Sequence, residues 1–203
     1  MKTVILHGLG QTSHDWPDVI NQASLPDVDC PELFSISKEN ISYPDILTGL
    51  EERYTNVTDP FCICGLSLGA LLALDYTIRH GDKIALLILI SAQYKAPTRL
   101  IDFQNLIFRF MPKKTFEGMG ISKRDTIHLS HSMRSLDFST RLNEIMCPVV
   151  LLCGEKDSAN LKASKQLNEL LPHAELHIIS GAGHEINKYA PEAVATVLKH
   201  KQR

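Results

Sequence analysis

Ser67 lies between two glycines, Gly65 and Gly69, at the point where one apolar run gives way to another. Residues 61–64 predict a strand, and the Leu- and Ala-rich residues 68–79 predict a helix. A serine on a sharp strand-to-helix turn presents its hydroxyl above the sheet, and small neighbours allow the chain to pass close to itself. The amino end of the following helix favours negative charge. The pattern therefore favours a nucleophile over an ordinary turn serine.

A serine hydroxyl is a weak nucleophile, so it needs a base and a carboxylate that orients the base. Asp157 follows the apolar run 149–153, and His184 follows the run 176–179. Both residues are expected in loops at the carboxyl ends of strands, where open α/β sheets build their sites. Glu155 follows the same run as Asp157 and is the alternative carboxylate, although it lies closer to the strand.

The elements that position these residues alternate along the chain. Apolar runs predict strands at residues 3–6, 33–36, 61–64, 84–90, 149–153 and 176–179, of which 33–36 is the weakest. Helical patterns lie between them at residues 44–54, 68–79, 158–171 and 191–200. The alternation predicts an α/β fold, with a mostly parallel six-stranded sheet and helices on both faces.

One segment interrupts this alternation. From about residue 94 to residue 147 no strand is predicted, and helical patterns cover residues 98–111, 123–135 and 138–145. The pattern at 98–111 spreads apolar residues over more than half of the helix circumference. Such a helix is expected to be covered on most sides or to lie over an apolar cavity. We therefore expect a helical insertion between two strands.

With Ser67, Asp157 and His184 in this order, the sequence resembles the α/β-hydrolase superfamily over nearly its whole length. Residues 7–10, His-Gly-Leu-Gly, are similar to the HGxG loop of that family. The resemblance implies that Ser67 is the nucleophile, Asp157 the acid and His184 the base. The loop after residues 84–90 reads Ser-Ala-Gln-Tyr and offers no carboxylate, which favours Asp157 as the acid.

The resemblance also implies an oxyanion hole formed by the backbone N–H groups of Leu9 and Leu68. We expect His7 to brace the loop of Leu9 rather than to take part in the chemistry. Because the sequence opens at the strand before the HGxG loop, the expected architecture is an α/β-hydrolase fold that lacks its first two strands. Residues 1–203 are expected to form one domain, with a small helical cap at about 94–146.

Four large side chains are candidates for lining a substrate pocket. Trp16 and Tyr94 suit a pocket and a core equally well, and Phe103 and Phe108 belong to the apolar helical pattern. His128 and His131 lie about one helical turn apart, but no third metal ligand is evident. We expect neither a metal nor an organic cofactor.

The function implied by the resemblance is a carboxylesterase that acts on small or medium apolar esters through an acyl-enzyme. One alternative is a non-hydrolytic lyase similar to the menaquinone-pathway synthase of the superfamily. Leu71 counts against it, because that enzyme has an arginine at this position. The other is a catalytically silent ligand-binding protein, which the retained Ser67, Asp157 and His184 argue against.

Composition limits the partners. The net charge is -2 and the pI about 6.5, so the sequence does not indicate binding to nucleic acid or to an anionic membrane. The five cysteines lie mostly within or beside apolar runs, as small buried hydrophobes do in a reducing compartment. No stretch is long enough to span a bilayer. We expect a cytoplasmic protein whose partner is a small-molecule ester.

Overall fold

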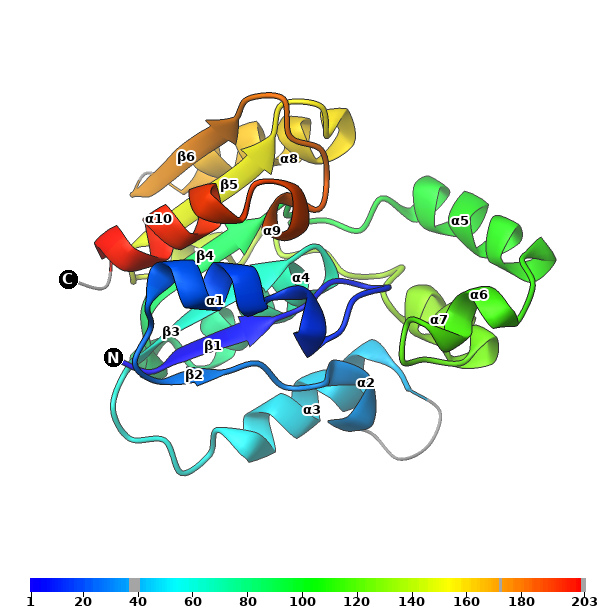
Figure 1. Cartoon of the computed structure of the whole chain (residues 1–203), viewed down its shortest axis with the longest axis horizontal. Coiled ribbons are helices and arrows are strands. Elements are labelled where there is room, and N and C mark those ends of the chain that lie inside the picture. Colours follow the sequence, from blue (N-terminus) through cyan, green and yellow to red (C-terminus); the bar gives the residue numbers. More distant parts are fainter. Residues whose placement is uncertain (37–40, 172, 202–203) are drawn as a thin grey trace.

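The computed structural model describes residues 1–36, 41–171 and 173–201. Its centre is a sheet of six strands in the order β2-β1-β3-β4-β5-β6, and every neighbouring pair is parallel (Figure 1). The strands are β1 (Thr3–Leu6), β2 (Val28–Asp29), β3 (Phe61–Leu66), β4 (Ile84–Ile90), β5 (Val149–Gly154) and β6 (Ala174–Ile179). The predicted fold class is therefore confirmed.

Helices occupy the connections between the strands. They are α1 (Pro17–Ala23), α2 (Leu33–Ile36), α3 (Tyr43–Arg53), α4 (Leu68–Arg79), α5 (Thr98–Phe110), α6 (Lys114–Glu117), α7 (Lys123–Ser132), α8 (Ser158–Leu170), α9 (Ile186–Tyr189) and α10 (Pro191–Lys201). Short 3₁₀ turns at Ser13–Asp15, Gly81–Lys83 and Leu142–Glu144 complete the set.

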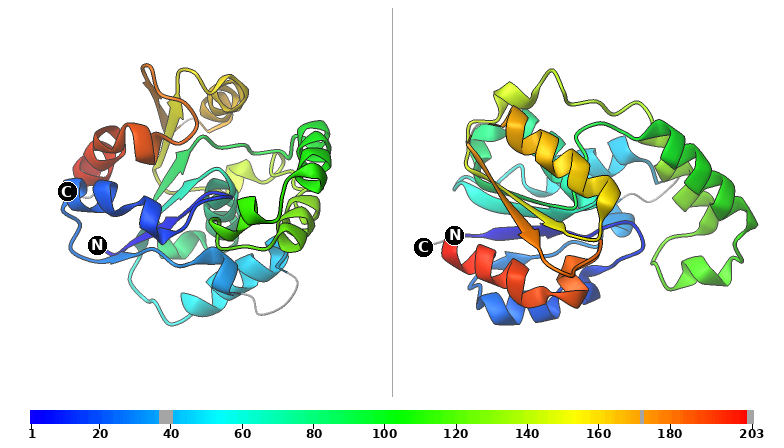
Figure 2. Two further views of the ribbon diagram at one scale, coloured as in Figure 1. Left: turned by 45° about the vertical axis from the view of Figure 1, so that its right-hand side comes forward. Right: turned by 90° about the horizontal axis from the view of Figure 1, so that it is seen from above.

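Both faces of the sheet are covered, because side chains of a strand alternate between its two sides. Val4 and Leu6 of β1 pack into a core with α2, α3, α4 and α8, whereas Ile5 packs into a second core with α1, α9 and α10. Figure 2 shows these helix layers on opposite sides of the sheet. The continuous apolar runs of β3, β4 and β5 reflect this burial on two faces.

The prediction of a strand at residues 33–36 is wrong. These residues form α2, and the edge strand is instead β2, which has only two residues. Leu33 and Phe34 are buried in the core, so their apolar character serves helix packing. A two-residue strand leaves no periodic signal in the sequence.

The inserted segment (residues 94–146) carries α5, α6 and α7 and extends beyond the carboxyl ends of the strands (Figure 1). The predictions at 98–111 and 123–135 correspond to α5 and α7. The helix predicted at 138–145 is wrong, since only Leu142–Glu144 forms a 3₁₀ turn there. The backbone at the start of this segment pairs with another part of the chain instead of forming a helix. The Phe138 N–H donates to the Tyr94 carbonyl, and Lys95 and Asp137 form an antiparallel bridge.

The cysteines fit the expected role of small apolar residues. Each of the five is a thiol outside any disulfide, and Cys62, Cys64 and Cys153 are buried within strands. Within the described ranges, no helix has the length and apolar character that crossing a membrane requires.

Candidate active site

Ser67 occupies a strained turn between β3 and α4. Its φ of 55° and ψ of -109° lie where residues other than glycine are rare, a kind of strain that concentrates at functional sites. Its N–H donates to the Ile90 carbonyl at 3.0 Å, which ties the turn to the end of β4. The side chain makes no hydrogen bond that caps the amino end of α4, so the hydroxyl has no role in starting the helix.

The two glycines beside Ser67 are required by close packing. A Cβ at Gly65 would lie 2.1 Å from the carbonyl oxygen of Gly69, and one at Gly69 would lie 2.0 Å from the carbonyl oxygen of Leu6. Neither distance is compatible with a side chain. The G-x-S-x-G spacing is thus the consequence of α4 crossing directly over β3 and β1.

His184 and Asp157 are brought together from two loops. Nδ1 of His184 lies 2.7 Å from Oδ2 of Asp157, and the imidazole is partly exposed while the carboxylate is largely buried. The loops are joined by a backbone hydrogen bond, since the Lys156 N–H donates to the Ala182 carbonyl at 2.9 Å. Asp157 follows β5 and His184 follows β6, as predicted from the sequence.

The carboxylate of Asp157 has a second donor that sequence reasoning missed. Asn160 Nδ2 lies 2.9 Å and 3.0 Å from the two carboxylate oxygens, and Gln93 Nε2 in turn donates to Asn160 Oδ1 at 2.7 Å. Burial raises the pKa of Asp157, but the hydrogen bonds from His184 and Asn160 outweigh it, so the pKa lies below its ordinary value. Asp157 is therefore ionised at neutral pH.

Glu155, the alternative acid, has other partners. Its Oε2 accepts hydrogen bonds from the Gly181 N–H at 2.8 Å and from the Ser180 hydroxyl at 3.0 Å. The Gly181 N–H and the Ser180 hydroxyl lower the pKa of Glu155. Glu155 braces the loop before His184, whereas Asp157 contacts the imidazole itself.

Ser67 and His184 are anchored to consecutive residues at the end of β4. Ile90 accepts the hydrogen bond from the Ser67 N–H, and the next residue, Ser91, donates from its hydroxyl to the His184 carbonyl at 3.1 Å. Ser91 itself has a positive φ of 50°. The end of β4 thus positions the turn of Ser67 and the loop of His184 against the same two residues.

The HGxG loop passes beside Ser67. A Cβ placed on Gly8 would lie 3.6 Å from the Cβ of Ser67. His7 is fully buried, its Nδ1 lies 3.0 Å from the Gly8 carbonyl, and its Nε2 accepts from the Leu33 N–H at 3.1 Å. The Leu33 bond requires Nε2 to be unprotonated, so Nδ1 carries the proton and donates to Gly8. His7 therefore braces this loop through its hydrogen bonds to Gly8 and Leu33.

A buried amide pair ties the same loop to the segment after His184. Nε2 of Gln11 donates to Oδ1 of Asn187 at 3.2 Å and to Oε1 of Glu185 at 3.0 Å. Gln11 Oε1 also accepts from the Gly8 N–H at 3.4 Å. Sequence reasoning missed this pair, because nothing in the order of residues relates Gln11 to α9.

Two N–H groups of the adjoining segments have no backbone acceptor in the described ranges. Neither the Leu9 N–H nor the Leu68 N–H donates to a backbone carbonyl in the ranges that the structure describes. The Leu68 N–H belongs to the first turn of α4, where such groups have no partner inside the helix. They are the two donors for which the family resemblance implies an oxyanion hole.

The four pocket candidates have different surroundings. Trp16 is fully buried in the core beside α1, so its core role is the one that the structure supports. Tyr94 is half-buried and its hydroxyl lies 3.3 Å from Oε1 of Gln166 on α8. Phe108 packs edge to face on Phe116 at 5.7 Å between ring centroids. Phe103, in contrast, is 60% exposed.

Met119 of the inserted segment is an addition that sequence patterns did not reveal. A Cβ at Gly10 would lie 3.7 Å from the Met119 sulfur, and one at Gly120 would lie 3.6 Å from Thr12 Cγ2. The turn after α6 therefore contacts the loop that carries Leu9. This contact places part of the inserted segment against the candidate oxyanion loop.

Solved structures with this architecture include several enzymes. A thermophilic esterase from Thermogutta terrifontis has a TM-score of 0.81 at 17% identity and covers 100% of this chain and 89% of its own. MenH from S. aureus has a TM-score of 0.82 at 18% identity, and the match covers 100% of this chain and 95% of MenH. The enol-lactonase from Burkholderia xenovorans LB400 has a TM-score of 0.82 at 15% identity, and the match covers 99% of this chain and 91% of the enol-lactonase. At these identities the likeness shows the fold. No curated protein matches the sequence.

A family model gives the assignment that single structures at low identity do not. The model described as the alpha/beta hydrolase family matches residues 3–197, which span the sheet, the inserted segment and the loops of Ser67, Asp157 and His184. This chain belongs to the alpha/beta hydrolase family.

Proposed function

We propose that this protein is a serine carboxylesterase that hydrolyses small or medium apolar esters through an acyl-enzyme. The observation that carries the proposal is the backbone conformation of Ser67. Its φ is positive, and its hydroxyl lies at the amino end of α4 without capping the helix. The hydrogen bond between His184 and Asp157 supports it, since a serine nucleophile needs an oriented base.

Each residue has a defined role in the proposed reaction. Ser67 Oγ attacks the ester carbonyl carbon while His184 Nε2 takes the hydroxyl proton. The bond to the alcohol oxygen then breaks, and His184 returns the proton to the leaving alcohol. Asp157 holds the imidazole tautomer through Nδ1 and stabilises the imidazolium. In the second half of the reaction, His184 takes a proton from a water molecule that attacks the acyl carbon. The bond to Ser67 Oγ then breaks, His184 returns the proton to Ser67, and the acid is released.

The oxyanion of each tetrahedral intermediate would be bound by the N–H groups of Leu9 and Leu68. Donors fixed in a folded backbone require no reorganisation as negative charge develops on the oxygen. The amino end of α4 adds its dipole to this stabilisation. His7, Gln11 and Asn187 hold the loop of Leu9 in place through their buried hydrogen bonds.

The inserted segment would act as a cap over this site. Its contact through Met119 and Gly120 to the oxyanion loop supports that role. We place Met119, Phe108 and Tyr94 nearest the acyl chain, and Phe103 outside the pocket because its ring is largely exposed. Five cysteines that remain outside disulfides support a reducing, cytoplasmic location.

A panel of p-nitrophenyl esters with increasing acyl length tests the proposal. The wild-type protein is expected to hydrolyse short esters with saturation kinetics and an initial burst of nitrophenol equal to the enzyme concentration. Asp157→Asn should abolish most of this turnover without loss of folding. Absence of hydrolysis across the whole panel by the folded protein would contradict the proposal.

A further inference from the structure

Helix α5 has a mainly buried inner face and an apolar outer face. The inner face, with Ile101, Asn105 and Phe108, packs against the remainder of the inserted segment. The outer face repeats apolar residues at helical spacing, and the exposed fractions are Phe103 60%, Leu106 51%, Ile107 43% and Phe110 83%. Of the two expectations for this helix, covering on most sides does not hold, because these four side chains are 43–83% exposed.

A contiguous exposed stripe of this kind marks an interaction surface more often than isolated apolar residues do. We define the outer face of α5 as these four residues. They lie at positions i, i+3, i+4 and i+7, so all four point to one side of the helix. Their partner must accept large apolar side chains along about two helical turns.

The charge of the same stretch identifies the kind of partner. Between Arg99 and Arg124 the sequence holds six basic residues and two acidic ones, a net charge of +4, whereas the whole chain carries -2. The even balance of the composition thus conceals a strongly basic inserted segment. Within the described residues, no carboxylate forms an ion pair with Arg109, Lys113 or Lys114.

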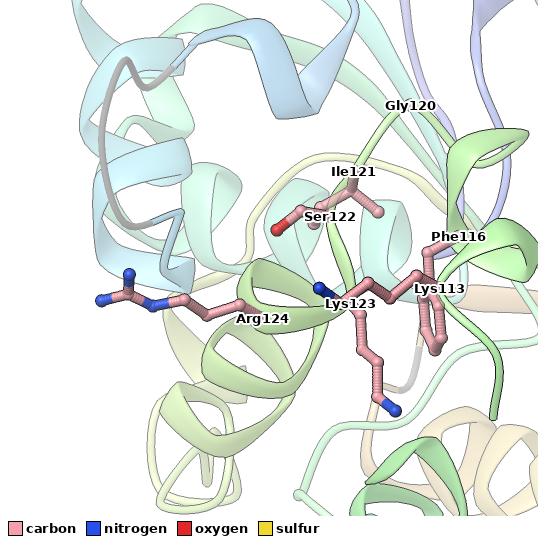
Figure 3. A pocket seen from close by; sticks show the side chains of 7 residues that line it. All are labelled: Lys113, Phe116, Gly120, Ile121, Ser122, Lys123 and Arg124. Atoms are coloured by element: carbon pink, nitrogen blue, oxygen red, sulfur yellow. The ribbon is translucent and has the colours of Figure 1, made fainter. Parts of the chain in front are cut away.

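The basic side chains gather at the carboxyl end of α5, next to the most exposed ring. Lys123 Nζ donates to the carbonyls of Arg109 and Met111 at 2.7 Å and 2.8 Å, which are the residues on either side of Phe110. Lys113 and Lys123 also line a hollow of about 490 Å³ together with Arg124 (Figure 3). In this view the ammonium of Lys113 extends toward the first turn of α7.

We propose that the outer face of α5 and the basic residues at its end bind an anionic lipid surface. The four apolar side chains would enter the boundary between headgroups and acyl chains, as the apolar face of an interfacial helix does. Arg109, Lys113 and Lys114 would contact lipid phosphates, and the hollow beside Lys113 has room for one headgroup phosphate.

Charge complementarity favours this occupant over a second copy of the chain. Two copies that met through the outer face of α5 would bring two segments of net charge +4 together. An anionic bilayer supplies both an apolar region for Phe110 and the opposite charge for the lysines. The surface is independent of the proposed ester hydrolysis, because it uses none of the residues assigned to that reaction.

Vesicle flotation measures this binding directly. The purified protein is mixed with vesicles of phosphatidylcholine alone or with phosphatidylglycerol added, and the bound fraction is measured at low and high salt. The wild-type protein should float with the anionic vesicles, and high salt should reduce the bound fraction because exposed charges are screened. Ser67→Ala should float equally, which separates this surface from the catalytic proposal.

Two double variants test the two halves of the surface. Leu106→Ser with Phe110→Ser removes apolar contact, and Lys113→Glu with Lys114→Glu reverses charge. Each should weaken binding to anionic vesicles by roughly tenfold or more while short-ester hydrolysis stays unchanged. The matched controls are Met146→Ser, an 86% exposed residue between Glu144 and β5, and Lys162→Glu with Lys165→Glu on α8. These controls should bind as the wild-type protein does.

Three results would overturn the proposal. The first is equal binding to neutral and anionic vesicles, and the second is an equal loss of binding in the control variants. The third is absence of vesicle binding. If sedimentation velocity then shows a dimer that the Leu106→Ser, Phe110→Ser variant does not form, the outer face of α5 binds a second copy of the chain instead.

Discussion

The Nδ1 atom of His184 lies 2.7 Å from Oδ2 of Asp157, although Glu155 precedes Asp157 by only two residues. The difference follows from the loop after β5, which turns Glu155 toward Ser180 and Gly181. Both carboxylates follow the same strand, so the direction in which each side chain points decides which of them contacts His184.

The two carboxylates should differ sharply in a kinetic test. Asp157→Asn is expected to reduce kcat by about 10⁴-fold, the loss found when a triad acid is neutralised, because the imidazole loses its oriented tautomer. Glu155→Gln keeps a hydrogen-bond acceptor for Gly181 and should change kcat less than about tenfold. Steady-state kinetics on a short ester checks both. A larger loss in Glu155→Gln would assign the acid to Glu155.

The buried amides of Gln11 and Asn187 should act as one unit. Gln11→Ala and Asn187→Ala should each lower the free energy of unfolding by about 1–3 kcal/mol, because each removes a hydrogen bond from the other, buried amide. The double variant should lose less than the sum of the two, since the hydrogen bond that joins the two amides is already lost in either single variant. Urea unfolding of the four proteins gives the coupling energy. Additive losses would show that the two side chains act independently.

Protonation of His7 should destabilise the protein at mildly acidic pH. Burial lowers the pKa of His7 below its ordinary 6.5, and the hydrogen bond to Gly8 and the charge of Glu32 offset only part of this effect. The unfolded chain therefore binds a proton on His7 at higher pH than the folded chain does. This contribution to stability is complete above about pH 6.5 and declines as the pH drops toward the folded pKa.

Urea unfolding at pH 7.5 and at pH 5.5 measures the effect. The free energy of unfolding of the wild-type protein should decrease between the two by an amount up to about 1.4 kcal/mol per pH unit, and the decrease should be smaller in His7→Asn. His14→Asn, at an exposed position near the same loop, is the control and should keep the wild-type decrease. An equal decrease in His7→Asn would refute the assignment to His7.

Acyl-chain selectivity should depend on the turn after α6 more than on the outer face of α5. Each methylene buried in the pocket contributes about 0.8 kcal/mol, so kcat/KM should rise roughly three- to fourfold per carbon until the pocket is full. Met119→Ser should flatten this rise because Met119 lies against the oxyanion loop. Phe103→Ser should preserve it. The ester panel checks the order, and an effect confined to Phe103 would contradict it.

Sequence patterns predicted the elements that are buried on two faces or carry a long helical stripe. The strands β3, β4 and β5 are continuous apolar runs, and α4 begins at the residue after Ser67. The two-residue β2 and the four-residue α2 were not predicted, because elements so short are fixed by contacts such as the one between Leu33 and His7. Tertiary packing decided them.

The candidate site shows the same division. Ser67, Asp157 and His184 follow predicted strands, so their convergence at one edge of the sheet was an expectation from strand order. Gln11 and Asn187 are 176 positions apart, and no local pattern relates them. The apolar pattern of α5 predicted a helix of the right length, but a periodic pattern does not reveal which of two apolar faces is covered.

The central claim is that Ser67 is the nucleophile, and covalent labelling with a fluorophosphonate tests it most directly. Mass spectrometry of the digested wild-type protein should find one adduct, on Ser67. Ser67→Ala should show neither the adduct nor ester hydrolysis while keeping its unfolding transition. Ser24→Ala is the matched control, since Ser24 is also a serine with positive φ and lies at the exposed end of α1. Labelling of Ser24→Ala should equal that of the wild-type protein. An adduct on another serine, or hydrolysis that persists in Ser67→Ala, would contradict the account.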